Sequence, residues 1–234
     1  MPEESNRTRT TEQDRRSAHE LALRVLTAAS NLPKEVALLP GDEPVRESIV
    51  RDILDMESTY EPESAAPTTP LEGRWALRFA SNGTVVTRPL AAAGSALSRA
   101  SDVSSSSLPP GVTIEDIVQT ISATPTTTRV TNEATVSVGP ISFRIVAEGP
   151  WEVSPSASSP SSSESESKLY FDEARFQVLG VFGTSTESWP QLPSLPIPFG
   201  DMNKASWTTT YLDERVRVQR ANTSGNLFVF EREE

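Results

Sequence analysis

The stretch SWTTTYLDERVRVQRANTSGNLFVFERE, residues 206–233, predicts the fold more directly than any other part of the chain. Val216 and Val218 alternate with polar residues, which is the period of a half-buried strand. Gly225 lies in a turn-forming run and can adopt a positive φ, and residues 227–230 form a second strand rich in aromatic side chains. The segment therefore predicts a β-hairpin.

A second stretch, LEGRWALRFAS at residues 71–81, alternates in the same way, with Trp75, Leu77 and Phe79 on one face of a predicted strand. The dipeptide Asn82-Gly83 is a strong hairpin signal. Further strands are predicted at 84–87, 112–122, 127–138, 141–148 and 168–179. The pattern indicates a mainly β protein.

Apolar residues recur at helical spacing in two segments, residues 15–31 and 44–58. The chain is predicted to contain a disordered tail (1–14), a helical segment (15–59), a linker (60–70) and a β domain (71–234). The β domain carries a low-complexity, Ser-rich loop at 154–167.

The composition excludes several classes of function. The formal net charge of the 234 residues is −11, so the chain lacks the basic face that nucleic-acid binding requires. No run of about 18 apolar residues is present, so no transmembrane helix is predicted. Without cysteine, and with His19 as its one histidine, the chain has no Cys/His metal spacing and no nucleophile–base pair. We therefore predict no catalytic residue, no metal and no cofactor, and a protein that is not an enzyme.

Four segments resemble blocks of a known family. Residues 206–233 are similar to the C-terminal signature of the plastid lipid-associated proteins, also called plastid fibrillins. There an aromatic-Thr-Thr-Tyr-Leu-Asp stretch leads into an Arg-containing strand, a Gly-bearing turn and a final Phe-Val strand. LEGRWALRFAS resembles the family's opening strand, VQTISA (118–123) its Tyr-Gln-x-Ile strand, and LYFDEARFQVLG (169–180) its Phe-Asp-Glu-Ala strand. The blocks occur in the family's order, so the resemblance covers residues 18–233.

The resemblance implies a lipocalin-like antiparallel β-barrel with two N-terminal α-helices packed at one end. It also implies a plastid (chloroplast) protein at thylakoids or plastoglobules that binds or carries a lipophilic small molecule. The ligand classes are a prenyl quinone, tocopherol, carotenoid or fatty acid. The competing hypothesis is a structural or interaction protein, with a barrel filled by its own side chains, that coats lipid globules or docks an unidentified partner enzyme.

The N-terminal sequence is unusual for an imported plastid protein. It contains Glu3, Glu4, Glu12 and Asp14, whereas transit peptides are poor in acidic residues. We interpret the chain as a mature or truncated form, or as a member imported by another route.

Nine residues are candidate ligand contacts: Trp75, Leu77, Phe79, Phe143, Trp151, Phe171, Tyr211, Asp213 and Arg217. Trp75 is interpreted either as a core residue that closes the barrel or as a pocket wall, and the first is favoured. Asp213 and Arg217 are predicted to share a strand face with Tyr211. That face is either solvated or, as the resemblance implies, holds a hydrogen-bonded pair inside the barrel. Because barrel closure joins the first and last strands, Arg217 is predicted to reach Asp213 or to lie across the Trp75 ring.

Overall fold

The computed structural model describes residues 3–60, 71–84, 86–88, 108–124, 126–155, 165–186, 188–190 and 204–233. In this part of the chain, three helices precede ten strands. The helices are α1 (Glu3–Ser30), α2 (Lys34–Leu38) and α3 (Pro44–Thr59). The strands are β1 (Gly73–Ala80), β2 (Val112–Ala123), β3 (Thr128–Val138), β4 (Ile141–Pro155), β5 (Ser165–Tyr170), β6 (Glu173–Val181), β7 (Thr184–Ser185), β8 (Lys204–Leu212), β9 (Val216–Ala221) and β10 (Leu227–Glu233).

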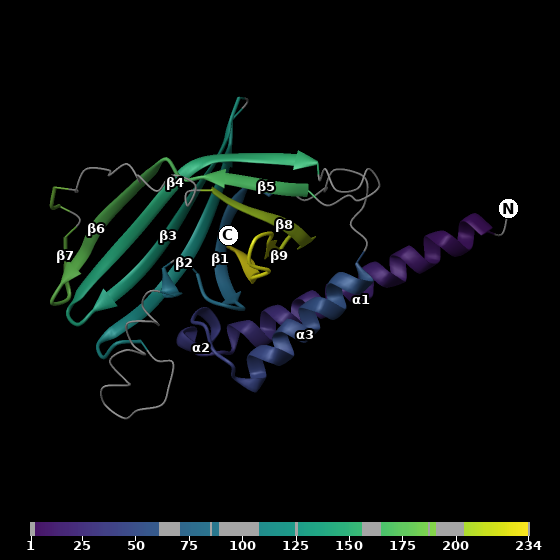
Figure 1. The fold of residues 1–234 in the computed structure, drawn as a ribbon, viewed down its shortest axis with the longest axis horizontal. Helices are drawn as coiled ribbons and strands as arrows, with labels where there is room; N and C mark the ends of the chain where they lie inside the picture. Colours follow the sequence, from purple (N-terminus) through teal and green to yellow (C-terminus); the bar gives the residue numbers. More distant parts are fainter. Residues whose placement is uncertain are drawn as a thin grey trace.

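Eight of these strands close an antiparallel barrel in the order β1-β10-β9-β8-β5-β4-β3-β2 (Figure 1). The β3–β4 ladder completes the ring, from Thr128 opposite Trp151 to Val138 opposite Ile141. β6 pairs with the first part of β4 and carries β7 on its outer edge, so the sheet continues beyond the barrel. The predicted mainly β, lipocalin-like fold is confirmed.

The strand predicted at 168–179 is broken into β5 and β6. At the break the chain passes so close to β4 that a Cβ atom on Gly149 would lie 1.7 Å from the carbonyl oxygen of Tyr170. β5 pairs with residues 151–155 of β4, and β6 pairs with residues 141–148. Gly149 therefore allows β4 to pair with two different strands: with β5 inside the barrel and with β6 in the sheet extension.

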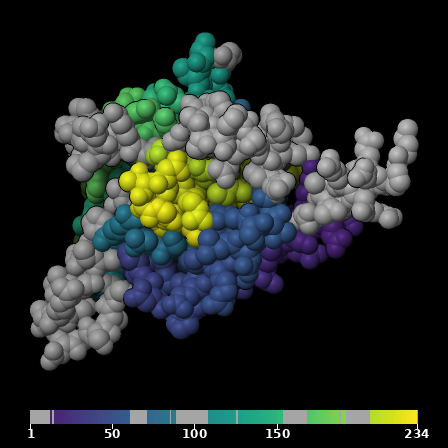
Figure 2. Space-filling model, turned by 45° about the vertical axis from the view of Figure 1, so that its right-hand side comes forward, coloured from purple at the N-terminus to yellow at the C-terminus, as the bar shows by residue number. Residues whose placement is uncertain are grey.

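Helices α1 and α3 lie along the outer wall of the barrel, where Figure 2 shows the blue helical segment against the yellow C-terminal strands. One apolar cluster joins the helices to this wall; its strand members are Phe79, Tyr211, Val216, Val218, Leu227 and Val229. The prediction that both helices pack at one end is wrong. Their long apolar stripes are buried by a surface of similar length, which the outer face of β9 and β10 supplies.

A second apolar cluster fills the interior of the barrel. Its strand members are Trp75, Leu77, Ala80, Ile114, Ile121, Val130, Trp151, Leu169, Trp207 and Phe230. The same cluster includes Ala37, Leu38 and Leu39, so α2 and the residue after it cover part of the interior. Sequence periodicity missed α2 because five residues are too few to show a helical period.

Three boundaries differ from the sequence prediction. α1 begins at Glu3, inside the tail predicted to be disordered, because a helix propagates at little cost once it has formed. β4 and β5 extend into the Ser-rich range 154–167, since backbone pairing does not depend on side-chain composition. Apart from Tyr60, the predicted linker 60–70 lies outside the described residues.

The strand expected at 84–87 is also wrong. Thr84 and Thr87 instead exchange hydrogen bonds, since the amide of each residue donates to the other's hydroxyl, at 2.6 and 3.1 Å. This is the reciprocal arrangement of a helix start. The chain therefore leaves the Asn82-Gly83 turn away from β1.

Candidate functional site

Arg217 lies inside the barrel and is completely buried, with an exposed fraction of 0%. Its Cζ atom lies 4.7 Å from the centroid of the Trp75 ring and 4.3 Å from that of Phe230. Nη2 donates a 2.6 Å hydrogen bond to Oε1 of Gln119. Nε and Nη1 have no hydrogen-bond partner among the described residues. A fully desolvated cation is thus held by two aromatic rings and one amide.

Strand register explains why these side chains meet. Trp75 lies opposite Gln119 in the β1–β2 ladder, and Phe230 lies opposite Arg217 in the β10–β9 ladder. Residues directly opposite each other point to the same face of a sheet. β1 also pairs with β10, where Leu77 lies opposite Phe230. Barrel closure therefore places all five side chains on the inner wall, although they come from distant parts of the sequence.

A second arginine, Arg232, also lies over the Trp75 ring, with its Cζ atom 4.2 Å from the centroid. Its Nη1 donates a 2.7 Å hydrogen bond to the carbonyl oxygen of Glu72. Gly73 makes room for it, because a Cβ there would lie 2.8 Å from that Nη1, and the φ of 126° is itself unfavourable for other residues. The glycine of the Gly-x-Trp motif thus allows Arg232 to approach the tryptophan.

The interior has an excess of positive charge. Among the residues whose burial is described, no Asp or Glu is buried, whereas Arg217 is. Burial, and secondarily the neighbouring charge of Arg232, lower the pKa of the Arg217 guanidinium well below its usual value. The cation is therefore held at an electrostatic cost that no buried carboxylate among the described residues offsets.

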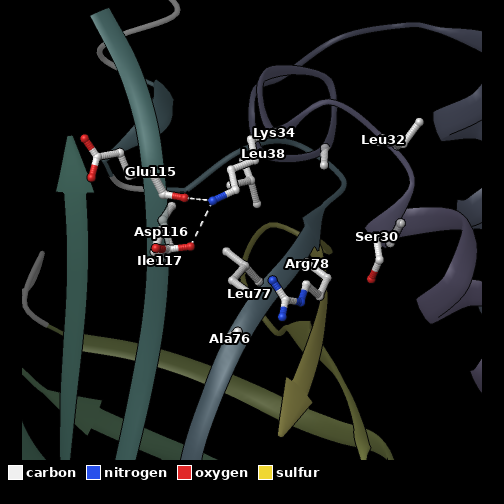
Figure 3. A pocket seen from close by; sticks show the side chains of 12 residues that line it. Ser30, Leu32, Lys34, Leu38, Ala76, Leu77, Arg78, Glu115, Asp116 and Ile117 are labelled. Atoms are coloured by element: carbon white, nitrogen blue, oxygen red, sulfur yellow. Dashed lines mark hydrogen bonds and ion pairs between the residues drawn. The ribbon is translucent and has the colours of Figure 1, made fainter. Parts of the chain in front are cut away.

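β1 and β2 separate beyond the pair formed by Ala76 and Val118, and α2 contacts both strands at this gap. Lys34 reaches across it from α2 (Figure 3). Its Nζ donates to the carbonyl oxygen of Glu115 and lies 2.9 Å from Oδ1 of Asp116. The side wall of the barrel is therefore closed here by a helix and a lysine bridge instead of a strand ladder.

A pocket of about 60 Å³ lies in this gap. Its lining includes Leu77 and Ile117, which stand two residues from Trp75 and Gln119 on the same strand faces. The pocket therefore borders the layer that holds the buried guanidinium. It is much smaller than the ~300–1,000 Å³ of sites that enclose a drug-sized ligand.

Towards the sheet extension the inner wall is apolar, and its exposure increases from Ala134 outward. Ile117, Ala134, Ile145 and Phe176 lie opposite one another across β2, β3, β4 and β6. Ala134 is 4% exposed, Ile145 is half-buried and Phe176 is 41% exposed. We call these four residues the apolar row. It connects the barrel interior to the surface of the extension.

The structure separates the predicted ligand contacts into two groups. On the inner side lie Trp75, Leu77, Trp151, Phe171 and Arg217, with Phe143 on the inner face of the extension beside Phe176. On the outer side lie Phe79 and Tyr211, beneath the helices, and Asp213, in the turn between β8 and β9. Register shifts between Leu77 and Phe79, and between Thr209 and Tyr211, turn these side chains outward.

The sequence model of the PAP_fibrillin family matches residues 34–231. The chain belongs to the PAP/fibrillin family. No curated protein and no solved structure matches this fibrillin significantly. The family is a lipid-associated and generally non-enzymatic one and implies a plastid location, and the barrel fits such a role.

The charged pair that the resemblance placed inside the fibrillin barrel does not form. Asp213 instead accepts hydrogen bonds of 2.7 and 2.6 Å from the backbone amides of Arg215 and Val216, and one of 2.7 Å from the hydroxyl of Tyr211. Nδ1 of His19, on α1, lies 3.0 Å from the same carboxylate. Burial, and next the hydrogen bond to Asp213, raise the pKa of the Tyr211 hydroxyl above its usual value. The cluster ties α1 to the β8–β9 turn on the outer wall.

Several residues of the site gave no sequence signal. Gln119 lies in an ordinary alternating strand, and its contact with Arg217 spans 98 positions. Arg232 lies near the end of β10, within the signature stretch, and no sequence pattern distinguishes it. In the described part of the chain, no group of three or more potential metal ligands comes together. The described helices are too short or too polar to cross a membrane.

Proposed function

We propose that this fibrillin binds and carries a lipophilic small molecule, of the prenyl quinone, tocopherol, carotenoid or fatty-acid class, at thylakoids or plastoglobules. In this proposal it acts as a binding protein and not as an enzyme. The observation that carries the proposal is the apolar row, because it gives an apolar ligand a continuous surface from the outside of the extension to the barrel interior.

Burial of a hydrocarbon chain along this surface supplies the driving force. Each buried CH₂ group contributes about 0.8 kcal/mol, so one five-carbon prenyl unit contributes up to about 4 kcal/mol. Such a surface selects for apolar ligands without distinguishing among the four classes. The pocket beside Leu77 and Ile117 supports a contact that reaches the inner wall.

Saturable uptake of a fluorescent fatty-acid or quinone analogue, competed by an unlabelled one, tests the proposal. Ile145→Asn places an amide in the middle of the apolar row and is expected to weaken uptake. Arg144→Gln is the matched control, because the neighbouring residue of a strand faces the opposite side. The absence of saturable uptake by correctly folded protein would exclude the proposal. An equal loss of uptake in Ile145→Asn and Arg144→Gln would show that the apolar row is not the binding surface.

A surface-coating function is the second candidate, and a group of exposed apolar residues favours it. Phe182 is 81% exposed, Trp189 57% and Val138 44%. The backbone amide of Phe182 donates to the carbonyl oxygen of Pro140, so the β6–β7 and β3–β4 turns lie side by side. In this function, Phe182→Ser reduces flotation with lipid droplets and leaves ligand uptake unchanged.

A further inference from the structure

The strongest unexplained feature of the barrel interior is the incomplete solvation of Arg217. A guanidinium has five N–H donors, one on Nε and two on each terminal nitrogen. Nη2 is bonded to Gln119, while Nε and Nη1 have no partner within the described structure. Three N–H donors of a fully buried cation are therefore left without an acceptor, and buried polar groups are normally hydrogen-bonded.

The aromatic contacts reduce this deficit without removing it. Stacking of a cation on Trp75 and Phe230 is favourable by about 0.5–2 kcal/mol for each ring, whereas burial of an unpaired charge is far more costly. A ring face is not a hydrogen-bond acceptor of the carbonyl or carboxylate kind, so the contacts with Trp75 and Phe230 leave Nε and Nη1 without such a partner among the described residues.

A second unpartnered donor belongs to the same interior cluster. Nε1 of Trp207 is buried and has no hydrogen-bond partner among the described residues. The Trp207 ring packs edge-on against Trp151, with centroids 5.4 Å apart. Arg217 and Trp207 are both donors, so the described part of the interior lacks an acceptor for them. It also lacks a negative group, since no Asp or Glu is among the buried residues that the structure describes.

We propose that Arg217 recognises the anionic head group of the ligand, so that the lipophilic molecule bound by this fibrillin is a long-chain carboxylate. This inference rests on the proposed function and narrows its ligand class. The carboxylate accepts from the free edge of the guanidinium, as charge-assisted hydrogen bonds between arginine and carboxylate are among the strongest in proteins. The hydrocarbon chain leaves across Leu77 and Ile117, which line the pocket beside this layer.

A neutral quinone satisfies the geometry less well. Its carbonyl oxygen can accept a hydrogen bond but leaves the positive charge of the interior unchanged. A carboxylate supplies acceptors for more than one N–H group and neutralises the charge that Arg217 and Arg232 together place beside Trp75. The expected preference is therefore for the acid over uncharged molecules with the same chain.

The experiment compares four ligands by calorimetric titration of the full chain at pH 8: dodecanoic acid, dodecan-1-ol, methyl dodecanoate and decyl-plastoquinone. The acid is expected to bind at least about tenfold more tightly than the alcohol and the ester. Arg217→Gln is expected to abolish this difference while the alcohol affinity changes little. Arg46→Lys is the matched control, because Arg46 is also buried but each of its three guanidinium nitrogens has an acceptor outside the barrel interior.

A second measurement keeps the proposal falsifiable if Arg217→Gln does not fold. In the wild-type protein, the side-chain Nε–H signal of Arg217, identified by its loss in Arg217→Lys, should shift on addition of acid and not of alcohol. Equal binding of acid and alcohol, or an acid preference that survives in Arg217→Gln, overturns the head-group assignment. Binding of decyl-plastoquinone without the acid overturns it and leaves the proposed function intact. If none of the four ligands binds, both the head-group assignment and the proposed function are wrong.

Discussion

Two arginines are buried in the described part of the chain, and their surroundings differ in kind. Arg46, at the start of α3, is 2% exposed and donates to the carbonyl oxygens of Val36, Gly41, Ala80 and Ser81. Its guanidinium also lies 5.1 Å from the Phe79 ring centroid. It therefore ties the segment around α2 to the end of β1, with acceptors for all three nitrogens.

Arg217 has the same side chain and is also buried, yet the described residues give it one acceptor, on Gln119. Burial lowers the pKa of both guanidinium groups, and the neighbouring Arg232 lowers that of Arg217 further, whereas Glu43 and Asp42 partly offset the effect at Arg46. In the proposal above, Arg46, whose three guanidinium nitrogens all have acceptors, holds the fold together, whereas Arg217 binds the head group of a ligand. The predictions below separate these two roles.

The largest effect is expected from removal of the ring that the two interior arginines share. Trp75→Ala deletes a fully buried indole and its 2.9 Å hydrogen bond to the carbonyl oxygen of Leu71. We expect the free energy of unfolding to fall by about 3–5 kcal/mol, from the cavity and from lost contact with Arg217. Chemical denaturation measures the change. A double-mutant cycle between Trp75 and Arg217 without coupling would contradict the stacking.

Exchange of each buried arginine for methionine tests the comparison directly. Arg46→Met leaves several carbonyl groups without a donor and should reduce stability by about 2–4 kcal/mol. Arg217→Met keeps much of the volume and removes an unpaired buried charge, so stability should change by less than about 1 kcal/mol in either direction. Denaturation of both variants in the same buffer provides the measurement. A loss as large for Arg217 as for Arg46 would make Arg217 a structural residue.

The contact between Trp75 and Arg217 was one of two arrangements predicted from the sequence, and its success has a topological reason. A closed barrel must pair its first and last strands. Because β10 pairs with both β1 and β9, residues of β1 and β9 lie close together whatever their separation in the sequence. The alternation of β2, β3 and β4 was equally readable, because half-buried strands carry a period of two. The same rule gave the hairpin of β9 and β10. It missed the turn after Leu212, so the first of the two strands predicted at 206–233 is in fact two strands, β8 and β9.

Local irregularities explain most of the errors. The turn after Leu212 makes β8 and β9 neighbouring strands, in which Tyr211 lies opposite Val218 and Leu212 opposite Arg217. Tyr211 therefore faces the outer wall and Arg217 the inner one, although one uninterrupted strand would give them the same face. Gly149 breaks a strand through a backbone contact that composition does not reveal. Gln119 and His19 enter their clusters through contacts between distant segments, and a single sequence contains no signal for such pairs.

The outer wall offers a further test, because there the arginines do have carboxylates. Glu231 accepts from Nε of Arg78 at 2.9 Å and from Nη2 of Arg215 at 2.8 Å. Desolvation opposes the effect of these two arginines on the Glu231 carboxyl, but the net result is a pKa below the usual glutamate value. Its contribution is therefore complete above the unfolded-state pKa and is lost as the pH falls through the lower, folded-state value.

Glu231→Gln should thus reduce stability at neutral pH by about 1 kcal/mol and flatten the decline on acidification. Urea titrations between pH 7 and pH 3 measure both. The same change at Glu152, an exposed residue of β4, is the control. If Glu231→Gln leaves the loss of stability at acidic pH unchanged, the ion pairs of Glu231 with Arg78 and Arg215 do not stabilise the fold, and the contrast with Arg217 fails.

The smallest effect on stability, but a specific effect on rate, is expected at the bridge over the β1–β2 gap. Lys34 and Asp116 are 49% and 63% exposed, so Lys34→Ala should change the free energy of unfolding by less than about 0.5 kcal/mol. If ligands reach Arg217 beside Leu77, loss of the bridge should raise the uptake rate of a fluorescent fatty acid several-fold in stopped-flow experiments.

Arg24→Ala is the matched control, because the Arg24–Asp52 pair has the same 2.9 Å separation but joins α1 to α3, away from the gap. An equal rate in wild-type protein and Lys34→Ala would move the route to the apolar row, and Phe176→Gln should then slow uptake where Lys34→Ala does not.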